Sequence, residues 1–272
     1  MKETKDNKVK LKLTKDLLKA SATMTDNQAR FLVDTYYQMQ DARIRSSAQV
    51  RGLKEGDEPS EVMGWIEEIN MQLEDNIKKA LHKYALGHPV GKWSLGITGI
   101  GPVISAGLLA YIDIKQAPTV GHIWRYAGQD PTCKWNKGQK RPWNANLKTL
   151  CWKMGECFVK VKNNKSDFYG KIFDQRKALE SENNEKLMYK SQADEGAKRV
   201  GKTTEAYKSY IVGKLPAGHI HARAKRYAVK LFLSHWHDVA YRNHYKAAPP
   251  FPYPIAHMGH AHQIPVPNQI AA

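Results

Sequence analysis

The sequence predicts a mainly α-helical protein, in which an antiparallel coiled-coil hairpin precedes a larger helical domain containing a helix-hairpin-helix. Three observations predict this fold class. Apolar residues recur every three to four positions over several long stretches. A polar turn with Gly56 and Pro59 separates the first two of these stretches. A glycine-rich turn, Gly-Ile-Thr-Gly-Ile-Gly-Pro, separates the next two.

The charge balance is strongly basic. The 272 residues include 43 Lys and Arg against 26 Asp and Glu, a net charge of +17, although the charged fraction of 25% is ordinary. A hydrophobic fraction of 42% is enough for a core and excludes a wholly disordered chain. The excess charge predicts a polyanionic partner, with nucleic acid ahead of an anionic membrane. A basic surface without a partner is the alternative.

The sequence predicts neither export nor membrane insertion. The first twenty residues hold seven lysines and no apolar run longer than two, which is unlike a signal peptide. No stretch approaches the ~20 apolar residues of a membrane span. The cysteines, Cys133, Cys151 and Cys157, form no CxxC pair and fit a reducing compartment. We therefore expect a cytoplasmic protein.

The N-terminal part divides into a basic arm, residues 1–23, and the hairpin, residues 24–90. Thr25 or Asp26 caps the first helix. Narrow apolar stripes with charged flanks are typical of a coiled coil, so we expect the hairpin to join two copies into a homodimer. A helix pair packed on the chain's own core is the alternative. The expected inward positions are Phe31, Leu32, Tyr36, Met39, Ile44, Val62, Trp65, Ile66, Ile69, Leu73, Ile77 and Leu81.

Residues 91–246 are expected to form the second domain, which opens with the glycine-rich turn. Glycines allow a tight backbone turn, and Pro102 suits the first turn of the next helix. Amide groups at such a helix start bind phosphate. A hairpin that only packs is the alternative. The candidate phosphate-binding positions are Gly99, Ile100 and Gly101.

A basic loop with two tryptophans follows. No acidic residue lies between Asp130 and Glu156. Cations neutralise phosphates and indoles stack on bases, so the pattern favours single-stranded or A-form RNA. A solvated loop with its tryptophans in the core is the alternative. The candidate RNA-binding residues here are Lys134, Trp135, Lys137, Lys140, Arg141, Trp143, Asn144 and Lys148.

Three further helices are expected, over 144–161, 166–185 and 219–245. The first has a clear apolar face. The acids of the second, interspersed with basic residues, are expected on a solvated face rather than at a metal; they are Asp174, Glu180, Glu182 and Glu185. Four cations of the last helix are expected to line the same RNA groove as the loop: Arg223, Lys225, Arg226 and Lys230.

The C-terminal tail, residues 247–272, holds six of the thirteen prolines and is expected to be extended. Eight of the eleven histidines lie after residue 218. A helix turns about 100° per residue, so a His-x-His pair points its rings apart, and no cysteine lies nearby to complete a zinc site. We expect no metal; polar contacts, including contacts to phosphate or base edges, are the simpler role.

The segment 95–150 resembles the C-terminal domain of insertion-sequence transposases guided by a bridge RNA. The resemblance is carried by Gly99-Ile100-Gly101-Pro102, by the Gly128–Pro131 turn, and by Asn144, Leu147 and Leu150. The later HARAKRYAVKLFL resembles the closing helix of that family, and the hairpin occupies the place of its coiled coil.

Two departures from that family change the expected function. The RuvC-like nuclease domain is absent, and the stretch 134–138 lacks the family's serine nucleophile. A hydroxyl is required for the covalent DNA step, so we expect no enzyme activity and no cofactor.

The coiled coil and helical domain are together similar to the Nop domain of box C/D guide ribonucleoproteins. They also resemble the Tas proteins of tandem interspaced guide RNA (TIGR) systems, of the type without a nuclease. This resemblance implies a prokaryotic or phage protein that binds a small guide RNA and addresses target DNA without cleavage, with base pairing reading the sequence. A guide-independent DNA-binding or transposition accessory protein built on the helix-hairpin-helix is the main alternative. An enzyme using the histidine-rich tail is a third.

Overall fold

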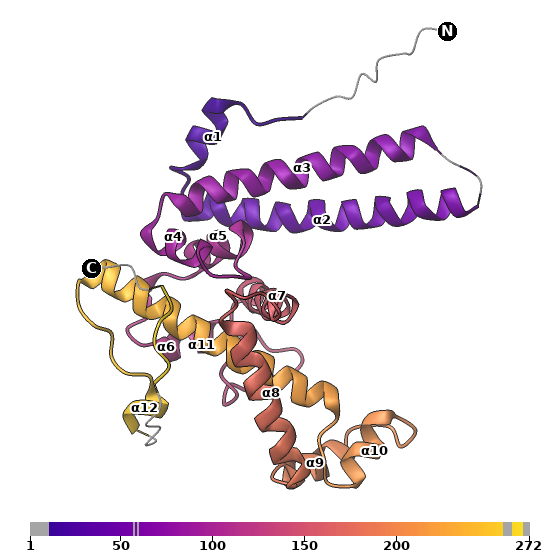
Figure 1. Ribbon diagram of the computed structural model, residues 1–272, viewed down its shortest axis with the longest axis vertical. Helices are drawn as coiled ribbons and strands as arrows, with labels where there is room; N and C mark the ends of the chain where they lie inside the picture. Colours follow the sequence, from indigo (N-terminus) through magenta and orange to yellow (C-terminus); the bar gives the residue numbers. More distant parts are fainter. Residues whose placement is uncertain (1–10, 57, 59, 258–262, 269–272) are drawn as a thin grey trace. The chain divides into compact units, whose positions relative to one another are not determined.

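The computed structural model describes residues 11–56, 58, 60–257 and 263–268. Across these residues the chain is mainly helical and contains no strand, which confirms the predicted mainly α-helical class (Figure 1). Most of the basic arm, residues 1–10, lies outside the described part. No helix in the described ranges combines the length and apolar character needed to cross a membrane.

The chain divides into two compact units. The first comprises residues up to Leu95 together with Gly101–Asp113, and the second comprises Gly96–Ile100 and the residues from Ile114 onward. This differs from the boundary expected at residue 90. The helix after the glycine-rich turn belongs with the hairpin, whereas the turn itself belongs with the second unit.

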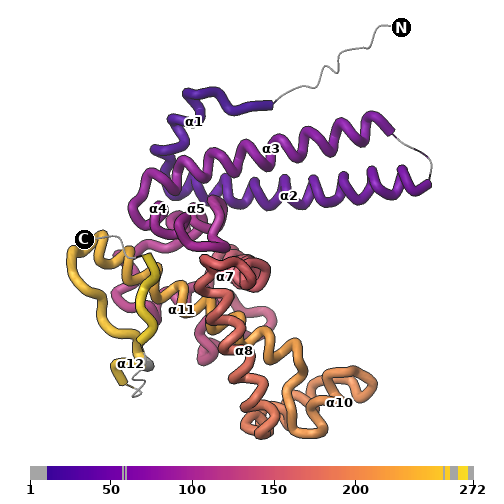
Figure 2. The backbone as a smooth tube through the Cα atoms, viewed as in Figure 1, coloured from indigo at the N-terminus to yellow at the C-terminus, as the bar shows by residue number. Residues whose placement is uncertain are grey.

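The first unit is built on the predicted hairpin. Helices α2 (Asp26–Glu55) and α3 (Glu61–Leu86) run antiparallel along each other, and α1 (Lys15–Ser21) packs on α3 (Figures 1 and 2). Thr25 begins α2 as expected: its side chain accepts a hydrogen bond from the Gln28 amide, and the Gln28 side chain accepts one from the Thr25 amide.

Helix α5 (Pro102–Tyr111) packs against both α2 and α3, and α4 (Pro89–Leu95) lies beside it. Nearly all of α5 is buried, because it is apolar around its whole circumference and must be covered on every side. Arg30 Nε donates to the Ala110 carbonyl at 2.6 Å, and the Tyr111 hydroxyl contacts Asp34 Oδ1 at 3.0 Å. These contacts explain why α5 belongs to this unit.

The predicted inward stripe of the hairpin is only partly correct. Phe31 and Ile44 are 70% and 52% exposed, and Val62 and Trp65 are 67% and 55% exposed. Polar contacts also connect the two helices: Arg43 Nε donates to Glu74 Oε2 at 2.5 Å, the Ser47 hydroxyl donates to Glu67 at 2.6 Å, and Gln40 donates to Glu74 at 3.3 Å. The apolar spacing therefore identifies the buried face for only part of the hairpin: Leu81 is buried, whereas Trp65 is exposed.

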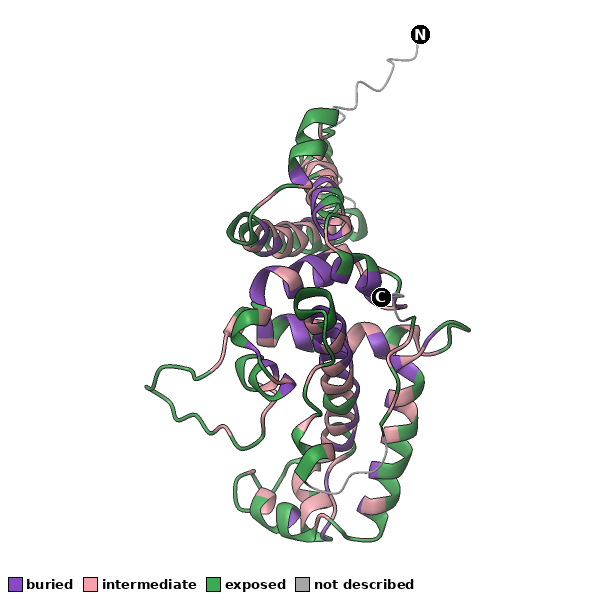
Figure 3. Cartoon of the chain, turned by 90° about the vertical axis from the view of Figure 1, so that its left-hand side faces the viewer, coloured by how far each residue is buried: buried purple, intermediate pink, exposed green. Residues whose placement is uncertain are grey.

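The second unit is assembled around a long central helix, α11, which packs against α6, α7 and α8, while α9 and α10 pack on each other. Figure 3 shows buried residues gathered on the facing sides of these helices. The helical elements are η1 (Ile114–Gln116), α6 (Val120–Tyr126), α7 (Ala145–Val161), α8 (Tyr169–Glu185), α9 (Lys190–Ala197), α10 (Glu205–Ile211), α11 (Ala217–Tyr245) and α12 (Tyr253–His257).

Aromatic packing forms the centre of this unit. The Phe158 ring of α7 stacks on Tyr169 with a centroid distance of 4.9 Å and lies 5.7 Å from Phe232 of α11. The face of α7 predicted to be buried is buried from Leu147 to Phe158. The sequence predicts α7 well because its regularly spaced apolar residues form one buried face, and the helix packs on α8 and α11.

The glycine-rich turn packs on the C-terminal end of α7. Gly99 has φ of +96°, and an added Cβ would lie 3.2 Å from Val161 Cγ2 and 3.3 Å from Phe158 Cδ1. Both the dihedral angle and the close approach require glycine. The Thr98 hydroxyl bonds to that of Ser166 at 3.0 Å, and Ile97 and Ile100 are buried.

The expectation of a fully extended tail is wrong. The tail contains α12, and it returns to α11, where the ring Nε2 of His235 bonds to the Ile264 carbonyl at 2.9 Å (Figure 2). A proline is tolerated at the start of a helix, because the first amides of a helix have no partner within it. Pro252 directly precedes α12, and its carbonyl accepts a hydrogen bond from the Ile255 amide.

Candidate nucleic-acid interface

The basic loop is anchored at its end by Asn144. Its amide donates to the Tyr126 carbonyl at 2.9 Å, and its side-chain nitrogen donates to the Tyr126 hydroxyl at 3.0 Å. Its side-chain oxygen accepts from the Leu147 amide at 2.9 Å and so caps α7. Asn144 was predicted to bind RNA, and its contacts give it the additional role of fixing the loop to α6 and α7.

Trp135 lies on the surface, with 37% of the residue exposed. Its indole nitrogen donates to the Gln139 carbonyl at 2.7 Å, and the Arg141 guanidinium lies 5.5 Å from its ring centre. The Trp143 ring is 6.4 Å away at an angle of 61°. The alternative in which both tryptophans enter the core is therefore wrong for Trp135, and the loop holds its indole in one place at the surface.

Trp143 is half-buried and packs against the next helix. The Lys148 ammonium lies 3.8 Å from its ring centre. Gly128 permits this contact: its φ is +62°, and an added Cβ would lie 2.8 Å from Lys148 Cδ and 3.1 Å from Trp143 Cγ. Burial, and secondarily the charge of Arg141, lowers the pKa of Lys148. An anion at this position would therefore be favoured.

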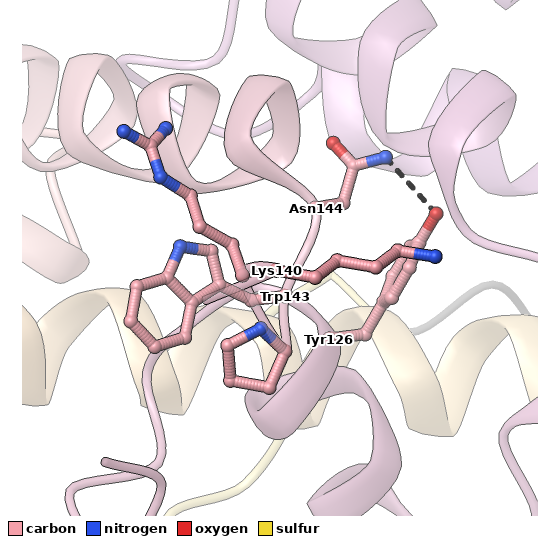
Figure 4. A pocket seen from close by; sticks show the side chains of 6 residues that line it. Tyr126, Lys140, Trp143 and Asn144 are labelled. Carbon is pink, nitrogen blue, oxygen red and sulfur yellow. Dashed lines mark hydrogen bonds between the residues drawn. The ribbon is translucent and has the colours of Figure 1, made fainter. Parts of the chain in front are cut away.

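An open pocket of about 410 Å³ lies at the base of the loop (Figure 4). Its lining combines aromatic faces with two cations and contains no acidic group: Tyr126, Lys140, Arg141, Pro142, Trp143 and Asn144. Tyr126 is 44% exposed and was not among the predicted site residues. The chemistry fits a base flanked by phosphates.

Trp152 extends this surface along α7 and was also missed. It is 57% exposed and lies one helical turn after Lys148. The Lys225 ammonium of α11 is 5.4 Å from its ring centre. The sequence could have indicated Trp152, because this tryptophan lies outside the apolar face predicted for the helix and has basic residues on both sides.

The loop cations remain available to a ligand. Lys134, Lys137, Lys140 and Arg141 are exposed, and none of them forms an ion pair with an acidic residue in the described ranges. Each can therefore neutralise a phosphate without first breaking an intramolecular pair.

The four cations of α11 do not form a single row beside this loop. Arg223 Nε donates to Glu180 of α8 at 2.7 Å, whereas Lys225 is ion-paired with Glu156 of α7. Lys230 lies 4.1 Å from the ring centre of Trp124. Arg226 is exposed. Arg223 and Lys225 are thus paired with acidic residues of two different helices, and the expectation that all four line one RNA groove stays a prediction.

The expectation that Glu180 lies on a solvated face is wrong, because only 1% of the residue is exposed. It accepts from Arg176 at 2.6 and 2.9 Å, from Arg223, and from the Tyr189 hydroxyl at 2.5 Å. Burial alone would raise the pKa of Glu180, but these hydrogen bonds outweigh it and hold the pKa below its ordinary value. Its role is to join α8 to α11.

The glycine-rich turn offers less to phosphate than predicted. The Ile100 amide donates to the Ile97 carbonyl at 2.9 Å, and its side chain is buried, so this amide is already partnered. Gly99 is held against α7. Gly101 caps α5 without a side chain and lies in the first unit.

Two histidines of α11, His235 and His237, make structural contacts. The Tyr169 hydroxyl lies 2.7 Å from His235 Nδ1, and His237 Nε2 bonds to the Ala117 carbonyl at 2.8 Å. Within the described ranges, no group of three His, Cys, Asp or Glu residues is placed to hold a metal. His260 and His262 lie outside those ranges.

Comparison with known proteins decides nothing further about this surface. The chain matches no protein-family model, no curated protein and no solved structure. Its function is therefore inferred from its own residues.

Proposed function

We propose that the protein binds RNA through the surface formed by the basic loop and α7. The observation that carries this proposal is the alternation of indoles and cations from the exposed Trp135 through the half-buried Trp143 and Lys148 to the exposed Trp152. Aromatic faces stack on bases, and unpaired cations neutralise phosphates, a combination suited to single-stranded segments. The bases of a duplex are stacked on one another and cannot stack on the indoles, so a duplex would interact only with the cations.

The RNA is a small guide, and the protein is the carrier that presents it to DNA without cutting. The resemblance of the glycine-rich turn, loop and closing helix to RNA-guided families supports this part of the proposal. The hairpin joins two copies. Its support is the row of exposed apolar side chains on α3, which includes Val62 and Trp65.

The decisive experiment purifies the full chain from cells that carry its native locus and sequences the bound RNA. Enrichment of one small RNA class is expected, and recovery of only random cellular RNA fragments would overturn the guide role. A competition at fixed salt between single-stranded RNA and duplex DNA tests the RNA preference. A clear preference for duplex DNA would favour a guide-independent DNA-binding protein.

A further inference from the structure

A second pocket, of about 480 Å³, lies in the second unit between α11 and the returning tail. Its size is within the ~300–1,000 Å³ of ordinary ligand pockets. Three aromatic side chains contribute to its wall: Trp124 of α6, Tyr227 of α11 and Phe251 of the tail. The Trp124 indole is fixed in place, because its nitrogen donates to the Lys230 carbonyl at 3.1 Å.

Two cations from different helices, Arg176 of α8 and Lys230 of α11, line this pocket. The Lys230 ammonium lies 4.1 Å from the Trp124 ring centre, and the Arg176 guanidinium lies 4.6 Å from the Tyr227 ring centre. Arg176 is paired with Glu180. Lys230 forms no ion pair with an acidic residue in the described part of the chain, although the charge of Asp130 acts on it.

The electrostatic balance of the pocket favours an anion. In the charged lining, Arg176 is offset by Glu180, and Arg242 is offset by Asp238 at 2.9 Å, so Lys230 is the cation left without an acidic ion-pair partner in the described part of the chain. Lys230 is partly buried, and this burial lowers the pKa of its ammonium. A charged group removed from water without a partner is unfavourable, and a bound anion would offset that penalty.

We propose that this pocket binds a nucleoside monophosphate group, with the base among Trp124, Tyr227 and Phe251 and the phosphate on Lys230. A planar base uses the aromatic wall, and a phosphate supplies the anion that Lys230 lacks. This inference rests on the proposed RNA binding, because it takes the group to be the terminal nucleotide of the bound RNA. A free nucleotide shares the same chemistry.

The test compares short RNA oligonucleotides of one sequence that carry a 5′-phosphate, a 3′-phosphate or hydroxyls at both ends. The full-length protein is expected to bind one phosphorylated form about tenfold more tightly than the hydroxyl form. Lys230→Met, which keeps the aliphatic stem, abolishes this difference, and Lys230→Arg retains it. Lys137→Met is the matched control: it weakens binding of every oligonucleotide by the same factor and preserves the preference.

The outcomes separate this inference from the proposed function. Failure of all oligonucleotides to bind would overturn RNA binding itself. Binding of all three with equal affinity, together with no Lys230-dependent binding of free nucleoside monophosphates, would overturn the pocket assignment alone. Lys230-dependent binding of the free nucleotides without an end preference would retain the ligand chemistry and assign the pocket to a free nucleotide.

Discussion

The Lys148 ammonium lies 3.8 Å from the centre of the Trp143 ring, and it does so from the first half of α7, one turn before the exposed Trp152. The contact joins the basic loop to the helix that follows it. The aromatic residues of the loop are therefore continuous with those of α7, and a bound strand would meet indoles and cations in turn.

Removal of an exposed indole is expected to weaken RNA binding without affecting the fold. Trp135→Ala and Trp152→Ala should each raise the dissociation constant for single-stranded RNA, because a stacked base contributes about 1–3 kcal/mol, or roughly 5- to 150-fold in affinity. Fluorescence anisotropy with a labelled oligonucleotide measures this. Met188→Ala removes an apolar side chain that is 66% exposed in the same unit and serves as the control. Unchanged affinity in both tryptophan variants would contradict the stacking role.

The salt dependence of RNA binding should distinguish free cations from paired ones. Lys137 is free, so Lys137→Gln is expected to reduce the slope of log affinity against log salt by about 0.7, the value for one phosphate on a single strand. Lys225 is paired with Glu156 and only 13% of its side chain is exposed, so Lys225→Gln should leave the slope nearly unchanged and lower the melting temperature. Equal slope changes in the two variants would show that Lys225 also contacts phosphate.

The sequence predicts helices well where the apolar residues of a helix form one continuous buried face. In α7, Leu147, Met154 and Phe158 follow a regular spacing, and all three are buried. The same reasoning is wrong for the hairpin, where polar pairs such as Arg43 with Glu74 connect the helices and Trp65 remains exposed.

Partners distant in sequence explain the errors in the predicted site. Glu180 lies among basic residues in a polar stretch, which is the usual pattern of a solvated face. It is buried because Arg223, 43 residues later, is brought to it by the packing of α11 on α8. The cations of the loop have no acidic residue near them in the sequence and none pairs with them in the described fold, while their contact with RNA stays a prediction.

Two buried histidines should make stability depend on pH near neutrality. Burial lowers the pKa of both His235 and His237 from the ordinary value of 6.5, although hydrogen bonds to backbone carbonyls partly oppose it. Below pH 6.5 the unfolded chain takes up protons that the folded chain excludes. The free energy of unfolding is therefore fully developed above pH 6.5 and falls as the pH is lowered through that value.

Urea unfolding at a series of pH values measures this effect. His237→Gln keeps a donor for the Ala117 carbonyl and removes the titrating ring, so its stability should vary less between about pH 7.5 and 5.5. His244→Gln replaces an exposed histidine of the same helix and should follow the unmodified protein. A profile for His237→Gln that parallels that of the unmodified protein would show that His237 does not contribute.

The exposed apolar row on α3 should hold two copies together. Val62, Trp65 and Leu73 lie within about 80° of one another around the helix and are 67%, 55% and 36% exposed. Trp65 is the largest of them, and buried tryptophans often contribute 2 kcal/mol or more to an interface, so Trp65→Ala should raise the dimer dissociation constant at least about 30-fold. Sedimentation velocity over a concentration series measures this, and circular dichroism verifies that the hairpin remains helical. Trp152→Ala removes an equally exposed indole from the second unit and should leave the dimer intact. A monomeric unmodified protein at every concentration, or equal dissociation constants for the unmodified protein and Trp65→Ala, would exclude this face as the contact between copies.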